Sequence, residues 1–542
     1  MYKMLQAKRV TNIVYIMIIL LSLTAAGGSD AVAQESDEIK RQTTIVTEET
    51  LYEWWLLRWT DNILVCQIFV DREGPPTPEE VIDECGLDIY QQWFKTPPCE
   101  EAAIGKPTTY CPGLYAYFAG FKPGKVTSVV DLPKPSVWLD ISGCDLRSPE
   151  NFCPQQPNLR FTAEEPLPEH EIQKINVVID QVQVSCQGDT CEVPVRSTTL
   201  GGAEIEFWAD SSFGDSSERY SARVRVIESG VPTNPGLDGW YVDVLSSQWL
   251  GGPVESCSVI WESFPPPGLP PNWLSTPSQE VLLASVEPYQ YLAGRLISQG
   301  LIDSSECTNN GLLINGYADA CGLSVARPLV DQWQNQFDNR ILEVAKETHL
   351  PAQVMKNIFA QESQFWPGIF RIPQEYGLGQ ITDMGADTIL LWNKPFFESF
   401  CPLILSDITC QQGYLGLEKE EQALLRGALA VEANADCPDC PSGVDLIHTD
   451  LSVMLFAQGI KANCDQVGQT IYNATQRIPG SVSSYEDLWR FTIANYNAGP
   501  GCLAFAIFST WGLREPLDWA HVSSHLTPAC QGVIAYVDSV TR

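Results

Sequence analysis

The sequence predicts a multidomain protein with a C-terminal all-α domain, preceded by a β-sandwich-like domain and a Cys/Pro-rich N-terminal region. Its 542 residues exceed the size of one ordinary domain. Apolar residues alternate with a period of two from about 172 to 261, and they recur at helical spacing beyond about 326. Eighteen cysteines are spread from Cys66 to Cys530, which indicates structural disulfides in an exported protein.

The N-terminus has the pattern of a signal peptide. Basic residues within 3–9 precede an apolar run over 13–25, and Ala31-Val32-Ala33 follows. We expect residues 1–33 to be removed, so that the mature chain begins at Gln34; the alternative is an uncleaved membrane anchor. The polar stretch 34–44 predicts a disordered linker. No later stretch is long and apolar enough to cross a bilayer, so we expect a mature protein without a membrane span, secreted or in the cell envelope.

The charge of the chain excludes two classes of partner. Aspartate and glutamate together number 67 against 33 basic residues, and the formal net charge is −34. Such a chain repels nucleic acid and anionic lipid surfaces, so neither is expected as a partner. The oligomeric state cannot be read from the sequence.

Residues 45–165 and 166–262 differ in composition and in apolar pattern. Residues 45–165 are rich in cysteine and proline without a dominant period, so no fold is predicted there. Residues 166–262 predict an immunoglobulin-like sandwich, in which Cys186 and Cys191 form a disulfide-clipped turn. The strands are expected at Val182/Val184, Ile205/Phe207, Ala222/Val224/Val226, Val242/Val244 and Cys257/Val259/Trp261.

Residues 263–325 begin with the proline-rich stretch 264–273, and they predict a semi-rigid linker with a helical connector. Residues 280–301 have helix-forming composition. One amphipathic helix is expected over 327–349, and a second over 350–363 with Pro351 at its first position.

The cysteine and histidine spacings indicate neither a metal site nor a redox centre. Cys437 and Cys440 have the thioredoxin spacing, but no βαβ pattern surrounds them. None of the five histidines completes a zinc pattern with a cysteine pair. We therefore expect no metal and no cofactor, and we expect Cys401, Cys410, Cys437 and Cys440 to be oxidised among themselves.

Glu362 interrupts an otherwise apolar helical stripe. It follows Ile358 by four positions and Phe359 by three, so it continues the buried face of the predicted helix. A buried carboxylate finds a partner, keeps its proton or lies in a cleft for chemistry. The alternatives are that the stripe emerges into solvent at this point, or that the side chain caps a helix or forms a salt bridge.

Three short motifs in this order resemble the lytic transglycosylases of the soluble transglycosylase (SLT) type. They are Glu362-Ser363, the stretch G-L-G-Q over 377–380, and Y-N-A-G-P-G over 496–501. Glu362 precedes Gln380 by 18 positions, which is the usual spacing of the family. The resemblance covers about residues 326–542.

The resemblance implies a lysozyme-like helical domain that cleaves the MurNAc–GlcNAc β-1,4 bond of peptidoglycan glycan strands. Glu362 matches the catalytic glutamate, and Ser363 matches the serine that supports the site. Gln380 matches a glutamine that lines the cleft. Tyr496 and Asn497 match the tyrosine–asparagine pair beside the glutamate.

The chain departs from the family pattern at several positions. Gly379 stands where the family usually has methionine, so a wall contact to the sugar is lost. The interval from Gln380 to Tyr496 is longer than usual and contains the four cysteines named above. Near the C-terminus Tyr536 and Val537 are kept, but Gly532 replaces the acid.

The implied mechanism needs one glutamate. It protonates the leaving oxygen while the substrate's acetamido oxygen attacks the anomeric carbon, and it then acts as base toward the C6 hydroxyl, which closes a 1,6-anhydro ring. An apolar setting raises the pKa of a carboxyl, as this acid requires near neutral pH.

Two alternatives stay open. A hydrolase on the same fold would use a positioned second carboxylate, and the nearest candidates are Glu375, Asp383 and Asp387. A non-catalytic wall-binding protein, in which the long insertion blocks the cleft, is the other. Phe365, Trp366 and Tyr376 either stack on sugar rings or belong to the core.

Overall fold

The computed structural model describes residues 41–96, 112–144, 151–234, 237–251, 254, 256–268, 270–368 and 375–542. The chain forms two compact units, Met1–Pro133 and Lys134–Arg542. The predicted signal peptide and residues 34–40 of the predicted linker lie outside the described residues. The linker prediction is wrong for residues 42–44, because they begin a β-strand. No helix among the described residues has the length and apolar character that a membrane span needs.

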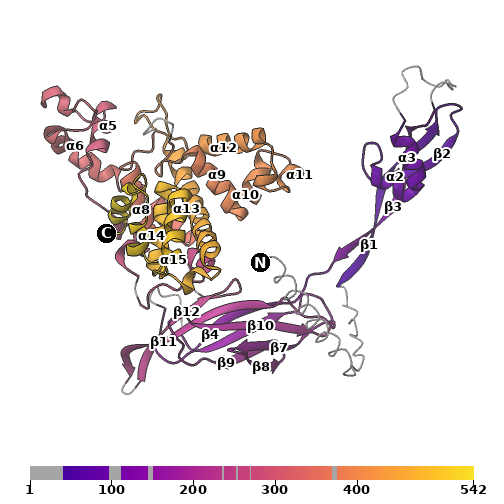
Figure 1. The fold of residues 1–542 in the computed structure, drawn as a ribbon, viewed down its shortest axis with the longest axis horizontal. Helices are drawn as coiled ribbons and strands as arrows, with labels where there is room; N and C mark the ends of the chain where they lie inside the picture. Colours follow the sequence, from indigo (N-terminus) through magenta and orange to yellow (C-terminus); the bar gives the residue numbers. More distant parts are fainter. Residues whose placement is uncertain are drawn as a thin grey trace, which may run out of the picture. The chain divides into compact units, whose positions relative to one another are not determined.

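The first unit is a three-stranded antiparallel sheet with two short helices. Its elements are β1 (Gln42–Arg58), β2 (Leu64–Val70), α2 (Pro78–Cys85), α3 (Leu87–Phe94) and β3 (Leu114–Asp131), with the strand order β2-β1-β3. β1 and β3 pair along their whole length, whereas β2 reaches only as far as Tyr52. The rest of β1 and β3 therefore forms a two-stranded ribbon (Figure 1). A disulfide between Cys66 and Cys85 joins β2 to α2.

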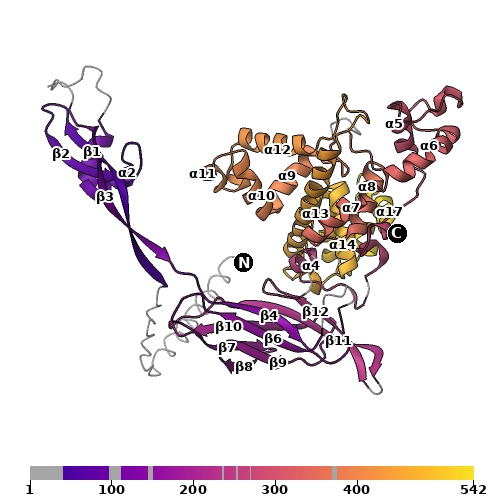
Figure 2. The same cartoon turned by 180° about the vertical axis from the view of Figure 1, so that it is seen from behind.

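The second unit begins with a two-layer β-sandwich. Its strands are β4 (Ser136–Ser142), β5 (Phe152–Cys153), β6 (Asn158–Glu164), β7 (Ile172–Ile179), β8 (Val182–Gln187), β9 (Thr190–Pro194), β10 (Ala203–Ser211), β11 (Tyr220–Asn234) and β12 (Leu237–Leu245). One sheet has the order β5-β12-β11-β10-β7-β8, and the other has the order β4-β6-β9. Every second residue of β4 and β10 is buried, so each sheet turns one face to the common core, where the Phe161 and Phe207 rings lie 5.0 Å apart. Figure 2 shows the strands of both sheets.

The predicted boundaries of the β-rich region need two corrections. The sandwich begins at β4 and not at residue 166, because β4 pairs with β6, and β6 pairs with β9, in the smaller sheet. The strand predicted over 257–261 is wrong, because these residues lie in α4 (Ser256–Trp261). Cys257 and Trp261 are four positions apart, which on a helix turns both side chains to the same face, and both are fully buried. The predicted clip between Cys186 and Cys191 is confirmed.

The C-terminal part is helical, as predicted. After α4 come α5 (Gln290–Ser298), α6 (Ala320–Trp333), α7 (Asp338–Thr348), α8 (Ala352–Glu362), α9 (Asp383–Trp392), α10 (Lys394–Phe400), α11 (Asp407–Cys410), α12 (Lys419–Ala433), α13 (Leu446–Thr475), α14 (Tyr485–Ala498), α15 (Pro500–Gly512), α16 (Trp519–Ser524) and α17 (Gly532–Val540). The 30-residue helix α13 is the central element, and α4, α7, α9, α12, α14 and α15 all pack against it (Figure 1). We call α4–α8 with α13–α17 the helical body, and residues 383–445 the insertion.

Two predictions about the start of the helical part are wrong. Residues 263–325 do not form a separate linker, because Trp273, Leu274 and Leu292 are buried in the core of the helical body. The single helix expected over 327–349 is divided into α6 and α7. At the break, Gln334 is fully buried and its Oε1 accepts hydrogen bonds from Ser285 Oγ (2.8 Å) and from the backbone N–H of Glu287 (3.1 Å).

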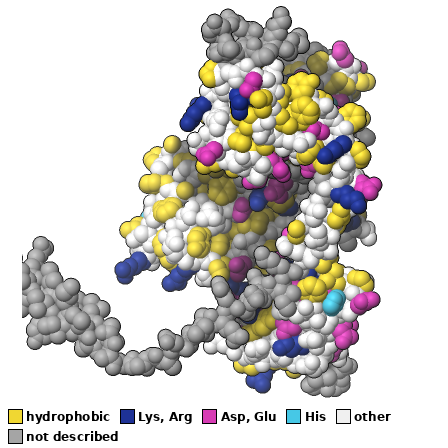
Figure 3. All heavy atoms as spheres, turned by 90° about the vertical axis from the view of Figure 1, so that its right-hand side faces the viewer, with side chains coloured by type: hydrophobic (Ala, Val, Ile, Leu, Met, Phe, Trp, Pro, Cys, Tyr) yellow, Lys and Arg dark blue, Asp and Glu magenta, His cyan; other side chains and the backbone are white. Residues whose placement is uncertain are grey.

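The insertion has a small core of its own and two local disulfides. Ile389, Phe397, Leu425 and Leu429 are among its buried residues. Disulfides join Cys401 to Cys410 and Cys437 to Cys440, so the prediction that these four cysteines pair among themselves is confirmed. Large apolar side chains nevertheless remain exposed on the insertion, namely Met384, Leu391, Leu403, Ile404, Ile408, Leu415, Leu424 and Val431. Exposed apolar side chains recur on the face of the molecule shown in Figure 3.

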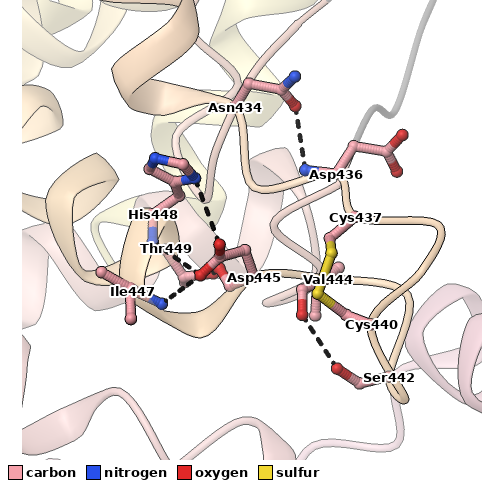
Figure 4. Close-up of a disulfide and its surroundings, with 10 residues drawn as sticks. All are labelled: Asn434, Asp436, Cys437, Cys440, Ser442, Val444, Asp445, Ile447, His448 and Thr449. Atoms are coloured by element: carbon pink, nitrogen blue, oxygen red, sulfur yellow. Dashed lines mark hydrogen bonds and ion pairs between the residues drawn. A yellow bond between two sulfur atoms is a disulfide. The ribbon is translucent and has the colours of Figure 1, made fainter.

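The Cys437–Cys440 disulfide lies in a turn directly before α13 (Figure 4). Asp436 directly precedes Cys437, and Asp445 accepts hydrogen bonds from the backbone N–H groups of Ile447 and His448 in the first turn of α13. The disulfide thus closes the turn that leads into this capped helix.

Candidate active site

Glu362 is the last residue of α8, and the body packs around it as the apolar stripe predicts. Val354, Met355, Ile358 and Phe359 on the same helix are buried, and Glu362 is only 8% exposed. The Tyr536 hydroxyl donates a hydrogen bond to Glu362 Oε1 at 2.6 Å. The carboxyl is thus held in a defined orientation inside the helical body.

Tyr536 was not among the predicted site residues. It lies on α17 and reaches Glu362 across 174 positions of sequence. The signal that indicated it was the retained Tyr536-Val537 pair near the C-terminus. Its importance becomes visible only when α17 packs against α8 and α14.

A buried ion pair anchors α8 at Lys356, six positions before Glu362. Lys356 Nζ donates to both carboxylate oxygens of Asp338, at 2.7 and 2.8 Å, and to Asn335 Oδ1 at 2.7 Å. Both charged side chains are almost fully buried. Burial raises the pKa of Asp338 and lowers the pKa of Lys356, while their mutual hydrogen bonds act in the opposite direction. The pair fixes α8 against the start of α7.

The G-L-G-Q stretch forms a tight turn against the end of α8. Tyr376 and Ile381 close the turn with two backbone hydrogen bonds, at 3.0 and 2.8 Å. Ser363 Oγ donates to the backbone carbonyl of Leu378 at 2.8 Å, and the N–H of Leu378 donates to Ser452 Oγ of α13 at 3.4 Å. The fully buried Ser363 therefore connects the Glu362 helix to the turn.

Both glycines of the turn are required by close contacts with α13. Gly377 has φ = +71°, and a Cβ atom there would lie 2.6 Å from Ser452 Cβ. A Cβ atom at Gly379 would lie 2.3 Å from the ring of Phe456. Phe456 also contacts the rings of Phe359 and Tyr496, with centroid distances of 4.7 and 5.4 Å. The Phe456 ring thus accounts for glycine at 379.

Gln380 lies near the end of the turn with its backbone in the left-handed region. Of its two polar side-chain atoms, only the nitrogen is hydrogen-bonded to the described residues. Its φ is +54°, and its side chain is 5% exposed. Nε2 donates to the carbonyls of Gly377 (2.6 Å) and Gly368 (3.3 Å). Oε1 is buried and accepts no hydrogen bond from the described residues. The structure therefore leaves one buried acceptor on Gln380 for a donor from outside the described chain.

Tyr496 joins α14 to the same turn, since its hydroxyl donates to the backbone carbonyl of Gly379. Burial, followed by the carboxylates of Glu362 and Glu375, raises the pKa of Tyr496 well above its usual value. Tyr496 consequently stays protonated and keeps donating over the whole physiological range. Asn497, at the end of α14, is exposed, whereas Asn495 is buried and donates to Asn463 Oδ1 and Gln466 Oε1, at 2.8 and 2.7 Å.

The three candidate second carboxylates have different surroundings. Asp387 accepts hydrogen bonds from Arg426 (2.9 Å) and from the Tyr414 hydroxyl, all within the insertion. Asp383 is exposed at the first position of α9. Glu375 is half-buried at the start of the turn, with its Oε2 atom shielded from solvent. Only Glu375 of the three acts electrostatically on Tyr496.

The aromatic residues after Glu362 are core residues for the most part. Phe365 and Trp366 are fully buried, and Trp366 stacks on Trp333 with a centroid distance of 5.6 Å. Of the two roles left open for these rings, the structure therefore favours the core. Tyr376 is half-buried beside the turn.

The described residues contain no group of three or more potential metal ligands among histidine, cysteine, aspartate and glutamate. Comparison of the chain with protein-family models, with curated proteins and with solved structures gives no match. The chemistry of the site must therefore be argued from its own residues. Those residues are a buried carboxyl, two tyrosine hydroxyls, a glutamine acceptor and a neighbouring carboxylate.

Proposed function

We propose that the helical body is a lysozyme-like domain and that the protein is an exported lytic transglycosylase, which cleaves the MurNAc–GlcNAc β-1,4 bond of peptidoglycan. The observation that carries the proposal is the convergence of three motifs that are distant in sequence. Ser363 is hydrogen-bonded to Leu378, and Tyr496 is hydrogen-bonded to Gly379. Glu362, the G-L-G-Q turn and Tyr496 thus belong to one connected site.

Glu362 acts as the proton donor and then as the base. Its buried position on α8 favours the neutral carboxyl. The Tyr536 hydroxyl donates to Oε1, which favours the proton on Oε2, the oxygen from which it is transferred to the leaving group. After the bond breaks, the carboxylate accepts the proton of the C6 hydroxyl.

The other residues position this carboxyl and the substrate. Tyr496 holds the turn through Gly379, and Ser363 holds the same turn from α8. Gln380 offers its Oε1 to a donor on the sugar, and Asn497 is accessible at the end of α14. No cofactor is required for any of these roles.

The cellular location follows from the substrate and from the cysteines. Peptidoglycan lies outside the cytoplasm, and a chain with eight described disulfides fits an oxidising compartment. We therefore propose that the protein acts in the cell envelope or is secreted.

Mass spectrometry of the products released from purified peptidoglycan tests the proposal. The wild type should release muropeptides that end in 1,6-anhydroMurNAc. Glu362→Gln keeps the shape and polarity of the side chain but cannot transfer the proton, so it should fold normally and lose more than about 10²-fold in turnover. Circular dichroism of the variant serves as the folding control. Products with reducing ends would identify a hydrolase instead, and an active Glu362→Gln would remove Glu362 from the chemistry.

A further inference from the structure

Glu375 is a carboxylate at the edge of the proposed site. It directly precedes the turn that Tyr376 and Ile381 close, and it is half-buried with Oε2 shielded from solvent. The opposite arm of this turn carries Gly379, whose carbonyl accepts the Tyr496 hydroxyl. The chain thus places a carboxylate next to the turn that lines the proposed cleft.

Two carboxylates converge on one tyrosine. The charges of Glu362 and Glu375 both act on the hydroxyl of Tyr496. An electrostatic effect of this kind requires distances that are short compared with the screening length of about 8–10 Å at physiological ionic strength. Both carboxylates therefore lie near the Tyr496 hydroxyl.

A second, independent observation indicates that a hydrogen-bond donor binds here. Gln380 is only 5% exposed, and its Oε1 accepts no hydrogen bond from the described residues. An unsatisfied buried acceptor is costly, and such groups are usually completed by a ligand or by water. The turn accordingly presents one buried acceptor, Gln380 Oε1, to a ligand.

We propose that Glu375 is a second catalytic carboxylate, which accepts a hydrogen bond from the N–H of the substrate's 2-acetamido group and so directs the acetamido oxygen at the anomeric carbon. Gln380 Oε1 accepts a second donor from the same sugar. This role rests on the proposed function, and it names the part of the substrate that the turn recognises.

The step balances without any further reactant. The acetamido oxygen forms a bond to C1 while the bond from C1 to the leaving O4 breaks and O4 takes the proton of Glu362. The cyclic oxazolinium that results is positively charged, and the Glu375 carboxylate stabilises it as an ion pair. The C6 hydroxyl then gives its proton to the Glu362 carboxylate, O6 bonds to C1, and the bond from C1 to the acetamido oxygen breaks.

The two glutamates differ in surroundings as these roles require. Glu362 is 8% exposed at the end of an apolar helix face, whereas Glu375 is half-buried and begins a turn. When two neighbouring carboxyls share a site, the repulsion of like charges favours one neutral and one ionised group. The more buried Glu362 keeps the proton, and Glu375 carries the charge.

Steady-state kinetics of the full chain on soluble, fully N-acetylated glycan strands test the proposal. The plot of kcat/KM against pH should be bell-shaped, because Glu375 must be ionised and Glu362 protonated. Glu375→Gln should lower kcat about 10²-fold or more, remove the acid limb and keep the alkaline limb. Glu375→Asp keeps the charge, so it should retain the acid limb with a smaller loss. Asp383→Asn, an exposed carboxylate of the insertion, is the matched control and should leave both limbs unchanged.

A partly de-N-acetylated strand supplies the decisive comparison. The wild type and Glu375→Gln should cleave bonds next to de-N-acetylated MurNAc equally slowly, because the group that Glu375 binds is missing. A Glu375→Gln variant with wild-type rates and an unchanged acid limb would overturn this role while leaving the proposed function intact. Reducing-end products that disappear in Glu375→Gln would make Glu375 a base for water and overturn it as well. A wild type that cleaves no glycan would overturn the proposed function together with this inference.

Discussion

The helical body and the insertion are stabilised over very different distances along the chain. In the body, a disulfide joins Cys257 to Cys464 across 207 positions, and the Trp261 indole donates to the carbonyl of Cys464 at 2.9 Å. In the insertion, the disulfides span 9 and 3 positions. The body buries its large side chains in one continuous core, whereas the insertion has a small core and exposes eight large apolar residues.

This difference matters because the helical body, and not the insertion, holds the residues of the proposed site. Glu362, Ser363, Tyr496 and Tyr536 all come from the body, and the turn over 376–381 is fixed to α8 and α13. The polar contacts of the insertion include local pairs such as Asp387–Arg426, while Asn393 donates to Gln458 of α13. Removing long-range contacts in the body should therefore lower the free energy of unfolding far more than removing local contacts in the insertion.

Truncation should have the largest effect. A chain that begins at residue 326 lacks α4 and α5, and with them the fully buried side chains of Trp261 and Leu292 and the partner of Cys464. We expect it to lose cooperative folding, because burying each such side chain contributes about 1.5–3 kcal/mol. A chain that begins at residue 254 should fold. Thermal unfolding followed by circular dichroism distinguishes the two, and a sharp transition in the shorter chain would contradict the assignment of α4 to the core.

Removal of disulfides compares the two regions directly. The chain-entropy estimate is about 5 kcal/mol for the Cys257–Cys464 loop and about 2.6 kcal/mol for the Cys401–Cys410 loop. Replacing both cysteines of each pair by alanine should lower the free energy of unfolding in that order. Chemical denaturation of the two double variants measures it. An equal or reversed ranking would show that the short-range disulfide of the insertion stabilises the protein as much as the long-range disulfide of the body.

Lys356→Met should destabilise the body by about 3–5 kcal/mol, because it leaves the buried Asp338 carboxylate without its partner. The double variant Lys356→Met/Asp338→Leu should recover most of this loss, since neither charge then remains. Urea denaturation of the two variants and the wild type gives the interaction energy. The substitution Arg426→Met, which breaks the more exposed pair with Asp387 in the insertion, is the matched control and should cost at most about 1 kcal/mol.

Tyr496→Phe should have the smallest effect, and its pH dependence is informative. The hydroxyl orients the turn and transfers no proton, so we expect a loss of up to about tenfold in kcat, equivalent to about 1.4 kcal/mol. Because burial and the two carboxylates raise the pKa of Tyr496 well above its usual value, it does not titrate where Glu362 does. The alkaline limb of the pH profile should therefore be unchanged in Tyr496→Phe. A shift of that limb would identify Tyr496 as the titrating acid.

Local patterns alone determined several features of this protein. The apolar stripe of α8 placed Glu362 on the buried face, and the alternation in β8, β10, β11 and β12 indicated the strands, because both depend on the periodicity of one segment. The clustering of four cysteines in the insertion predicted their pairing, since short loops limit the possible partners. The order of the three motifs led to the expected site.

Contacts between distant segments decided the rest. Nothing near residue 261 indicates that Trp261 is buried against α13, and no short pattern brings Tyr536 to Glu362 across 174 positions. The alternation at 257–261 predicted a strand, yet the disulfide to Cys464 and the surrounding core favour a helix there. The three nearby carboxylates look alike in sequence, and only the packing of the turn against α14 sets Glu375 apart from Asp383 and Asp387. Burial and charge at a site depend on which surfaces meet, and that is a property of the tertiary structure and not of any one segment.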